Sequence, residues 1–429
     1  MQFVKVDELR EGMRLARPIY NKQGVLLYER DSRLTKQGIA SILNFGLIGL
    51  FILEPAEPVP PMTQADIEFE RFQTMTVFAI QEEMERIRNT GKMAKLQVIS
   101  GSIVKNYGHL DSPINFIQSL RSREDYIYKH ALNVAILCTM ITNVMNVKLD
   151  ERQNTIFAAL LHDIGKLSLP PEMMDMPDMT PEMKAMVHKA EVNAYDMVEK
   201  VFYEGAMVRR ICQQSQKILE EMDVEEKTNM KLFTGSKILA VADTYDTMTA
   251  MKISGAPLSE VAAIKFLLER PDTFDPQVVK ALIRCINILT PGVSVELNTG
   301  EKALVINQNE LNILRPIVLS FRDNSIINLD TKLYDDIEIV DKNIDFRRVN
   351  NLKIYFDNNV IPLTTDIYKI EEWQGGDIVV FDGHIGIVSD KRNKNGVSFI
   401  IHHANPYQRY YEEDMLENRN DIIGHYRIS

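Results

Sequence analysis

Apolar residues recur every three or four positions through the middle of the chain. Phe69, Phe72, Ile80 and Met84 are an example, and the same spacing continues to about residue 290. This period matches the roughly 3.6 residues of a helical turn, so residues 65–290 are predicted to form a helical bundle. Most of these methionine-rich and aliphatic stripes are interpreted as core packing.

The pattern changes on both sides of this helical region. Residues 1–55 mix short alternating runs with one helix, which predicts a small α+β module. Residues 56–64 are rich in proline and predict a semi-rigid linker. After residue 290, short strand-like runs predict a β-rich tail over 291–340 and a further β-rich unit over 341–429. The predicted fold is therefore multidomain and mainly α, with β-rich parts towards both ends.

The amino-acid composition argues against some classes of binding partner. The 429 residues carry 49 Lys and Arg against 60 Asp and Glu, a formal net charge of −11. An acidic surface repels phosphodiester backbones and anionic lipid, so bulk nucleic-acid binding and membrane insertion are not expected. The apolar stretch 39–53 is shorter than the roughly 20 residues of a spanning helix. Three well-separated cysteines and the lack of an export signal predict a cytoplasmic protein without disulfides.

Histidine and aspartate residues supply the candidate chemistry of the helical region. His162 and Asp163 follow an apolar helix, with Lys166 one turn beyond, and His130 lies inside another apolar stripe. Asp243 ends a third apolar run. An imidazole is costly to bury without a partner, and imidazoles and carboxylates from separate helices are the ligands of a metal in a bundle core. The pattern therefore predicts a metal site.

The contexts of these residues resemble the HD phosphohydrolase superfamily and, more narrowly, its HD-GYP branch. The resemblance covers roughly residues 125–289 and includes the stretches YKH, LHDIGK and VADTYD. That branch is associated with hydrolysis of the bacterial second messenger cyclic di-GMP by two or three iron or manganese ions. The resemblance implies a set of metal ligands and two catalytic residues: ligands His130, His162, Asp163 and Asp243, a less certain ligand His188, and catalytic Asp163 and Lys166.

Two stretches depart from the branch. Its paired histidines correspond here to Gln213 and Gln214, and an amide oxygen is a weaker donor than imidazole for a transition metal. Its substrate-binding arginines correspond to residues 252–255, which hold one Lys and a Gly. We therefore expect one tightly bound ion per chain, iron or manganese, as in simpler HD enzymes in which a metal-bound water attacks phosphorus. Glu124 or Asp125 would be the added ligand of any second ion.

Two functions remain open at this point. The first is metal-dependent hydrolysis of a phosphodiester or nucleotide of the cyclic di-GMP type, which the retained ligands and Lys166 favour. The second is a signalling or binding module without turnover, which Gln213 and Gln214 favour. Both predict a small nucleotide or phosphodiester as ligand. A second copy of the chain or a signalling protein is the expected protein partner.

The last stretch of the chain has its own histidines. A Gly-His-Ile-Gly pattern around His384, followed by His402, looks like the C-terminal half of a papain-like, NlpC-type cysteine hydrolase. The resemblance implies a vestigial base at His384 and a vestigial orienting residue at His402. The nucleophile is missing because no cysteine follows Cys285. We expect no thiol-dependent activity, and we expect the uncovered sheet to pack on the helical domain or on a partner chain.

Overall fold

The computed structural model divides the chain into two compact units. The larger unit contains residues 3–51 and 60–344, and the C-terminal unit contains residues 345–429 with the short segments 1–2 and 52–59. The residues described by the structure are 2–20, 25–53, 63–170, 173, 180–201, 205–222, 224, 231–251, 256–291, 293–309, 312–323, 325–341, 361–381, 384–402, 412–419 and 421–427. The predicted linker 56–64 lies almost wholly outside these residues, as do residues 252–255.

A small sheet with one helix forms the N-terminal module. Its three-stranded sheet has the order β1-β5-β2, and β3 pairs antiparallel with β4. Thr35 caps the helix by accepting a hydrogen bond from the Gly38 amide, and Gly46 ends it with a φ of +64° that favours glycine. The elements are β1 (Gln2–Lys5), β2 (Arg14–Leu15), β3 (Ile19–Tyr20), β4 (Leu26–Tyr28), α1 (Lys36–Asn44) and β5 (Gly49–Leu53).

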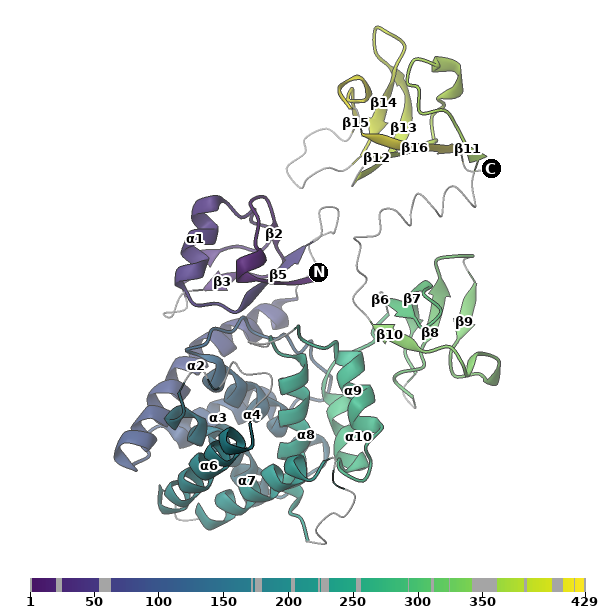
Figure 1. Ribbon diagram of the computed structural model, residues 1–429. Coiled ribbons are helices and arrows are strands. Elements are labelled where there is room, and N and C mark those ends of the chain that lie inside the picture. The colour runs from purple at the N-terminus through teal and green to yellow at the C-terminus, as the bar shows by residue number, and fades with distance from the viewer. Residues whose placement is uncertain are drawn as a thin grey trace. The chain divides into compact units, whose positions relative to one another are not determined.

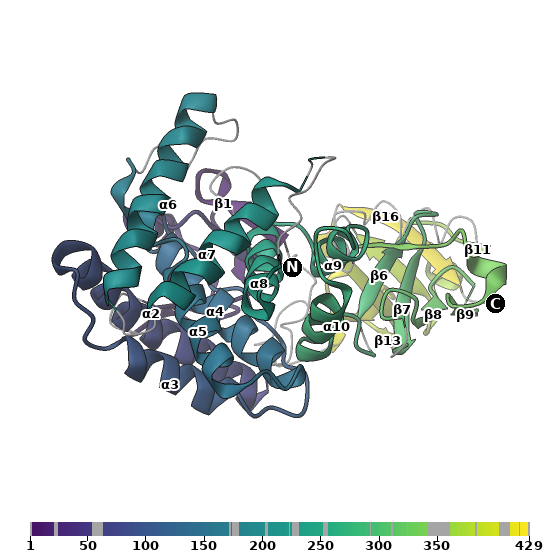
Figure 2. The same cartoon turned by 90° about the horizontal axis from the view of Figure 1, so that it is seen from below.

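The helical region follows in the same unit, and Figures 1 and 2 show its helices packed around α4. The long first helix starts with reciprocal hydrogen bonds between Thr63 and Asp66 and ends at Gly91. The helices are α2 (Gln64–Thr90), α3 (Leu96–Tyr107), α4 (Tyr126–Val144), α5 (Leu149–Leu161), α6 (Pro181–Val201), α7 (Gly205–Glu220), α8 (Thr234–Thr249), α9 (Glu260–Leu268) and α10 (Pro276–Cys285).

Helix α4 is the centre of the bundle. It is apolar on almost every side, and most of its residues are buried against α2, α3, α5, α8 and α10. A helix that is hydrophobic all round belongs inside a protein, which explains this position. Any polar side chain on α4 must therefore find its partners in the interior.

A five-stranded antiparallel sheet extends the same hydrophobic core beyond α10. Its order is β10-β6-β7-β8-β9, and buried residues alternate with less buried ones along β6 and β7. This alternation is typical of a sheet that packs on one face. The strands are β6 (Ser294–Leu297), β7 (Lys302–Asn307), β8 (Ile317–Ser320), β9 (Ile326–Asn328) and β10 (Ile339–Asp341).

The C-terminal unit is a six-stranded antiparallel sheet with a small core of its own. The strand order is β11-β16-β12-β13-β14-β15, and Trp373, Val379, Phe381 and Ile400 belong to its core. The strands are β11 (Ile361–Pro362), β12 (Ile378–Phe381), β13 (His384–Arg392), β14 (Ser398–Ile401), β15 (Glu412–Glu413) and β16 (Ile422–Arg427).

The overall architecture agrees with the sequence prediction. The protein is mainly helical in its central region, with an α+β module before it and β-sheets after it. Within the described residues, every helix is too short or too polar to cross a membrane.

Candidate metal centre

Four predicted ligands come from two helices and one helix junction. His130 lies on the central helix α4, and Asp243 lies on α8. His162 follows the last residue of α5, and Asp163 begins the short 3-10 helix Ile164–Ser168. The change of helix type at His162 and Asp163 turns two successive side chains into the same interior space. His130, His162 and Asp163 are all buried there.

Gly165 allows this turn to sit close to α6. A Cβ atom at this position would lie 2.8 Å from the carbonyl oxygen of Ala190 and 2.8 Å from the Cα of Glu191. Only glycine avoids that clash with backbone. The glycine of the LHDIGK stretch therefore has a packing role, which places α6 against the ligand turn.

The four side chains converge. The Nε2 atoms of His130 and His162 are 3.2 Å apart, and His130 Nε2 is 3.1 Å from Asp243 Oδ1. Asp163 places Oδ2 3.7 Å from His130 Nε2 and Oδ1 3.7 Å from His162 Nε2. Asp243 Oδ2 is 3.9 Å from His162 Nε2. Ligand atoms of His130, His162 and Asp163 thus all lie within 4.8 Å of one another, and Asp243 borders this cluster beside the two histidines.

Hydrogen bonding assigns the tautomers of both histidines. His162 Nδ1 is 2.8 Å from the carbonyl oxygen of Ala159, which can only accept, so Nδ1 carries the proton. His130 Nδ1 is 2.7 Å from Asp246 Oδ2, a carboxylate that also accepts. In the neutral state, both Nε2 atoms are therefore lone-pair donors that face each other and the Asp243 carboxylate. A positive charge, either a proton or a metal ion, stabilises such an arrangement of acceptors.

The spacing fits a transition metal. Two nitrogens bound to one ion at about 2.0–2.1 Å lie about 2.9–3.4 Å apart for bond angles between roughly 90° and 109°. The 3.2 Å between the histidine nitrogens and the 3.1 Å between His130 and Asp243 both fall in this range. The Asp163 oxygens are a few tenths of an ångström further away. The residues present therefore fit a single divalent ion.

Electrostatics of the protein alone also indicate a missing positive charge. Burial lowers the pKa of His130, but its hydrogen bonds to Asp243 and Asp246 outweigh this and raise the pKa to about 9. A proton on His130 thus takes the place of a cation. Burial raises the pKa of Asp163, but the positive charge of Lys166 and the two histidines lowers it by more. The net effect is a lowered pKa, so this carboxylate stays ionised.

Lys166 is bound to Asp163 through both carboxylate oxygens, at 2.7 and 2.8 Å from Nζ. Burial lowers the pKa of Lys166, but the charge of Asp163 more than compensates and keeps the ammonium protonated. Its side chain is about one-third exposed, so it borders the site from the solvent side. The lysine can orient Asp163 and present a positive charge to an incoming anion.

Asp246 is a functional residue that the sequence analysis did not include in the site. It is fully buried, and Arg121 Nη2 donates to its Oδ2 at 2.5 Å while Gln118 Nε2 and Asn133 Nδ2 both donate to its Oδ1 at 2.9 Å. Four donors, His130 included, hold this carboxylate in place. It fixes the ring of His130, a role that carboxylates often have behind metal-ligating histidines. Its position one turn after Asp243 was the available signal.

The predicted ligand His188 has its contacts elsewhere. Its side chain is 56% exposed, and its Nδ1 lies 3.1 Å from Glu220 Oε1. On the same helix, Glu191 is buried next to the ligand turn, and its pKa rises to about 7, first through burial and then through the charge of Asp163. Glu191 shares the buried face of α6 with Ala194, Tyr195 and Val198, and a carboxylate at that apolar spacing was the sequence signal for it.

The two glutamines that replace histidines have different surroundings. Gln214 Oε1 accepts from the Phe233 amide at 2.9 Å and from Ser236 Oγ at 3.0 Å, so this amide joins α7 to the start of α8. Gln213 is half-buried on α7. The glutamine that reaches towards the ligand turn is Gln216, which donates to Glu191.

The acidic residues considered for a second ion lie in another environment. Asp125 pairs with Lys129 at 2.6 Å and accepts from the Ser122 amide at 2.7 Å, and both Glu124 and Asp125 line a pocket next to the N-terminal module. Their side chains therefore serve the start of α4 and that pocket.

The histidines of the C-terminal unit form a separate set. His384 begins β13, but its side chain lies outside the described residues. His402 is buried after β14, with Nε2 3.4 Å from Glu413 Oε2. A third histidine, His425, has Nδ1 2.8 Å from the Thr364 carbonyl oxygen and Nε2 3.1 Å from Asp377 Oδ2. Sequence analysis did not select His425.

Two protein-family models match parts of the chain. Residues 115–278 match the model of the HD domain family, and residues 324–428 match a domain of unknown function (DUF1287). The helical region is thus similar to an HD domain, and the C-terminal part of the chain is similar to a different domain family. The first match includes all four ligands that converge.

Three curated relatives match parts of the chain. Cyclic di-GMP phosphodiesterase PA4108 of Pseudomonas aeruginosa is 24% identical over 229 residues, which are 52% of this chain and 53% of the relative. Cyclic di-GMP phosphodiesterase PdeB of Borreliella burgdorferi is 24% identical over 211 residues, 48% of this chain and 55% of the relative. The uncharacterized protein YijF of Escherichia coli is 37% identical over 92 residues, 20% of this chain and 43% of the relative. The chain thus spans about half the length of the curated relatives it matches.

Proposed function

We propose that the helical domain is a metal-dependent phosphodiesterase that hydrolyses cyclic di-GMP or a closely similar cyclic dinucleotide in bacterial signalling. Two relatives with this activity in their names are each 24% identical to about half of the chain. One structural observation carries the proposal most directly. The Nε2 atoms of His130 and His162 lie 3.2 Å apart beside the carboxylates of Asp163 and Asp243, an arrangement that a divalent ion stabilises.

Each residue of the site has a defined task in this proposal. His130, His162, Asp163 and Asp243 hold the ion, and imidazole with carboxylate suits iron or manganese. When bound, the ion supplies Lewis-acid stabilisation of a phosphoryl group and lowers the pKa of water. Lys166 keeps Asp163 ionised and oriented, and it adds positive charge where a phosphate approaches.

A second function is supported by the surroundings of the replaced histidines. The amide of Gln214 is engaged in joining α7 to α8, and Gln216 is engaged with Glu191. Imidazole ligands for further ions are thus absent from these positions. A domain with a single ion that binds cyclic di-GMP and signals without hydrolysing it would be consistent with this observation.

The deciding experiment is an assay of the full chain after loading with Mn²⁺, or with Fe²⁺ under anaerobic conditions. Cyclic di-GMP and a generic phosphodiester serve as substrates, and cyclic di-GMP binding is measured in parallel. His162→Ala is compared with His188→Ala, because His188 is exposed and paired with Glu220. We expect hydrolysis that His162→Ala abolishes and His188→Ala retains. Tight binding without turnover in the metal-loaded protein would favour the signalling module instead.

A further inference from the structure

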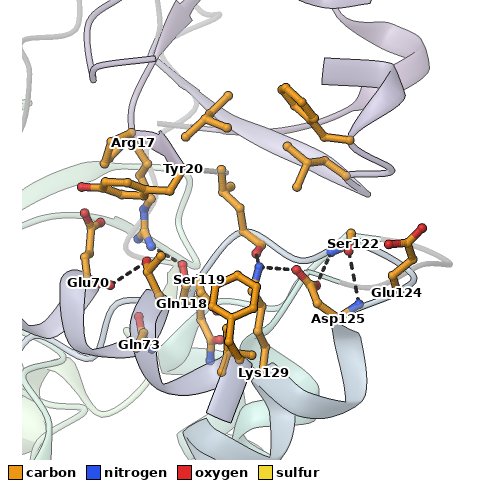
Figure 3. A pocket seen from close by; sticks show the side chains of 18 of the residues that line it. Arg17, Tyr20, Glu70, Gln73, Gln118, Ser119, Ser122, Glu124, Asp125 and Lys129 are labelled. Atoms are coloured by element: carbon orange, nitrogen blue, oxygen red, sulfur yellow. Dashed lines mark hydrogen bonds and ion pairs between the residues drawn. The ribbon is translucent and has the colours of Figure 1, made fainter. Parts of the chain in front are cut away.

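A pocket lies between the N-terminal module and the helical domain, and the four predicted ligands are not among the residues that line it. Its volume is about 360 Å³, within the usual range of small-molecule sites of roughly 300–1,000 Å³. The module contributes the residues around β3 and the end of α1, and the helical domain contributes α2 and the segment that leads into α4. In Figure 3, Arg17, Tyr20 and Glu70 gather at one end, and Ser122, Glu124 and Asp125 lie at the other.

The two bodies are joined by backbone around this pocket. The Ile48 amide donates to the Arg121 carbonyl oxygen at 2.9 Å, and Leu47 and Ser122 form an isolated β-bridge. Arg17 donates to the carbonyl oxygen of Gln118. Hydrogen bonds between the N-terminal module and the helical domain thus hold the pocket walls together.

The charged side chains at the two ends of the pocket differ in how many hydrogen bonds and ion pairs they form within the protein. Lys129 pairs with Asp125 at 2.6 Å and also donates to the Leu120 carbonyl oxygen, so this end is closed. At the other end, the Glu70 carboxylate has no hydrogen bond and no ion pair to any described residue. Arg17 uses one nitrogen on Gln118, and its remaining donors are available to a ligand.

Burial affects both of these groups. It raises the pKa of Glu70, against the charge of Arg17, and it lowers the pKa of Arg17 to about 10 despite the charge of Glu70. The two residues influence each other without forming an ion pair within contact distance. A ligand that donates to the carboxylate and accepts from the guanidinium would satisfy both.

The pocket lining is partly aromatic and includes Tyr20, Phe45 and Phe78. Aromatic walls favour a flat ligand. Guanine combines the three properties, because it has adjacent N–H donors on one edge, the acceptors O6 and N7 that arginine binds, and a planar ring. Adenine lacks the donor edge that a carboxylate would bind.

We propose that this pocket binds a guanine base, with Glu70 accepting from the donor edge and Arg17 donating to the acceptor edge. Gln118 connects the pocket to the metal centre. It lines the pocket, and its side chain donates to Asp246 Oδ1 at 2.9 Å, while Asp246 Oδ2 holds His130 Nδ1. A ligand that shifts Gln118 changes the support of His130, so occupancy alters the metal affinity. This regulatory part rests on the proposed function, whereas guanine binding itself does not.

The test measures binding by calorimetry with the metal-free full chain. Guanosine is the probe because it has no phosphate to attract the metal centre, and inosine and adenosine are compared with it. The variants are Glu70→Gln and the matched control Glu68→Gln, an exposed glutamate on the same helix. We expect guanosine to bind best, inosine less well and adenosine weakest, with a loss of at least tenfold in Glu70→Gln and none in Glu68→Gln. Thermal unfolding shows whether both variants are folded.

Several outcomes would overturn the proposal. These are no binding of guanosine at millimolar concentration, equal binding of adenosine, or unchanged affinity in a folded Glu70→Gln variant. The coupling is tested by titrating Mn²⁺ with and without saturating guanosine, and we expect the Mn²⁺ affinity to change by at least threefold. The same factor must appear in the guanosine affinity when Mn²⁺ is bound. Because guanosine binding is measured without catalysis, an inactive phosphodiesterase would leave this part of the result intact.

Discussion

Two buried histidine–aspartate clusters, one in each unit, use the same residue types and differ in how completely their hydrogen bonds are satisfied. In the helical domain, His130 and His162 each use Nδ1 on an acceptor and leave Nε2 facing other acceptors. In the C-terminal unit, both nitrogens of His425 contact oxygen acceptors, and its ring stacks on Trp373 with centroids 3.8 Å apart.

The aspartates show the same difference. Asp377 receives two donors from Arg427 at 2.7 Å, the Gln374 amide at 2.8 Å, and His425. These donors satisfy the carboxylate oxygens of Asp377 without a metal ion. Asp243, by contrast, accepts one hydrogen bond from Thr247 Oγ1 at 3.1 Å, and its other close polar neighbour is His130 Nε2 at 3.1 Å, an atom that carries a lone pair in the neutral tautomer. An open set of acceptors indicates a metal centre, and a closed set indicates a structural cluster.

The largest effect is expected for Asp163→Asn. The carboxylate contacts the ligand space and Lys166, and its loss removes one negative charge from the metal centre. Groups behind metal ligands typically cost about 10–100-fold, so a ligand itself should cost at least about 100-fold in phosphodiesterase activity. Steady-state kinetics with cyclic di-GMP measure this. Wild-type activity in a folded Asp163→Asn protein would contradict the assignment.

Asp246→Asn should have the next largest effect. The amide can no longer accept in the same way from His130, Arg121 and Gln118, so the His130 ring loses its fixed tautomer. We expect Mn²⁺ affinity to fall by about 10–100-fold, as for other supporting carboxylates. Competition with a fluorescent chelator measures it. If only thermal stability changed and Mn²⁺ affinity did not, Asp246 would be a purely structural residue.

The C-terminal cluster gives the opposite expectation. Asp377→Asn breaks a charged pair with Arg427 and should destabilise the C-terminal unit by about 2 kcal/mol, the usual contribution of hydrogen bonds to charged groups. Metal content and phosphodiesterase activity should stay at wild-type values. Denaturant unfolding followed by Trp373 fluorescence reports on this unit, because it holds the only tryptophan. Loss of metal in this variant would erase the difference between the two clusters.

The smallest effect concerns Glu191, whose pKa is raised to about 7 by burial and by Asp163. The folded protein binds this proton more tightly than the unfolded chain, where the pKa is about 4.5. Stability is therefore lost as pH rises from about 4.5 through 7. Glu191→Gln removes this loss, so the metal-free variant should match the wild type at pH 4.5 and be more stable than the wild type at pH 8. Identical unfolding profiles at both pH values would contradict this.

Much of the fold and part of the site were predictable from sequence. Three- and four-residue apolar spacing indicated the bundle, and alternation indicated the sheets. His162, Asp163 and Asp243 were selected because they lie at or near the end of an apolar run, and His130 because it lies inside one, where a polar residue needs an interior partner. His188 was selected only because it lies where the HD-GYP branch has another metal-binding histidine. The structure shows it exposed and places the buried Glu191 one turn later.

Other features depend on packing that a linear pattern does not specify. The role of Asp246 follows from which nitrogen of His130 faces the ligands, and this is set by the relative rotation of α4 and α8. The use of Gln214 to anchor α8, and the strand order β11-β16-β12-β13-β14-β15, likewise depend on contacts between distant segments. Sequence spacing carries information within one element, and these features arise between elements.

Metal stoichiometry tests the central claim most directly. The full chain is loaded with Fe²⁺ or Mn²⁺, passed through a desalting column, and analysed for metal per chain, with X-ray absorption reporting the ligands. We predict one ion per chain, bound to two imidazole nitrogens and to carboxylate oxygens at about 2.0–2.2 Å, and lost in His130→Ala. No retained ion, two or more ions per chain, or an ion that persists in folded His130→Ala would contradict the account.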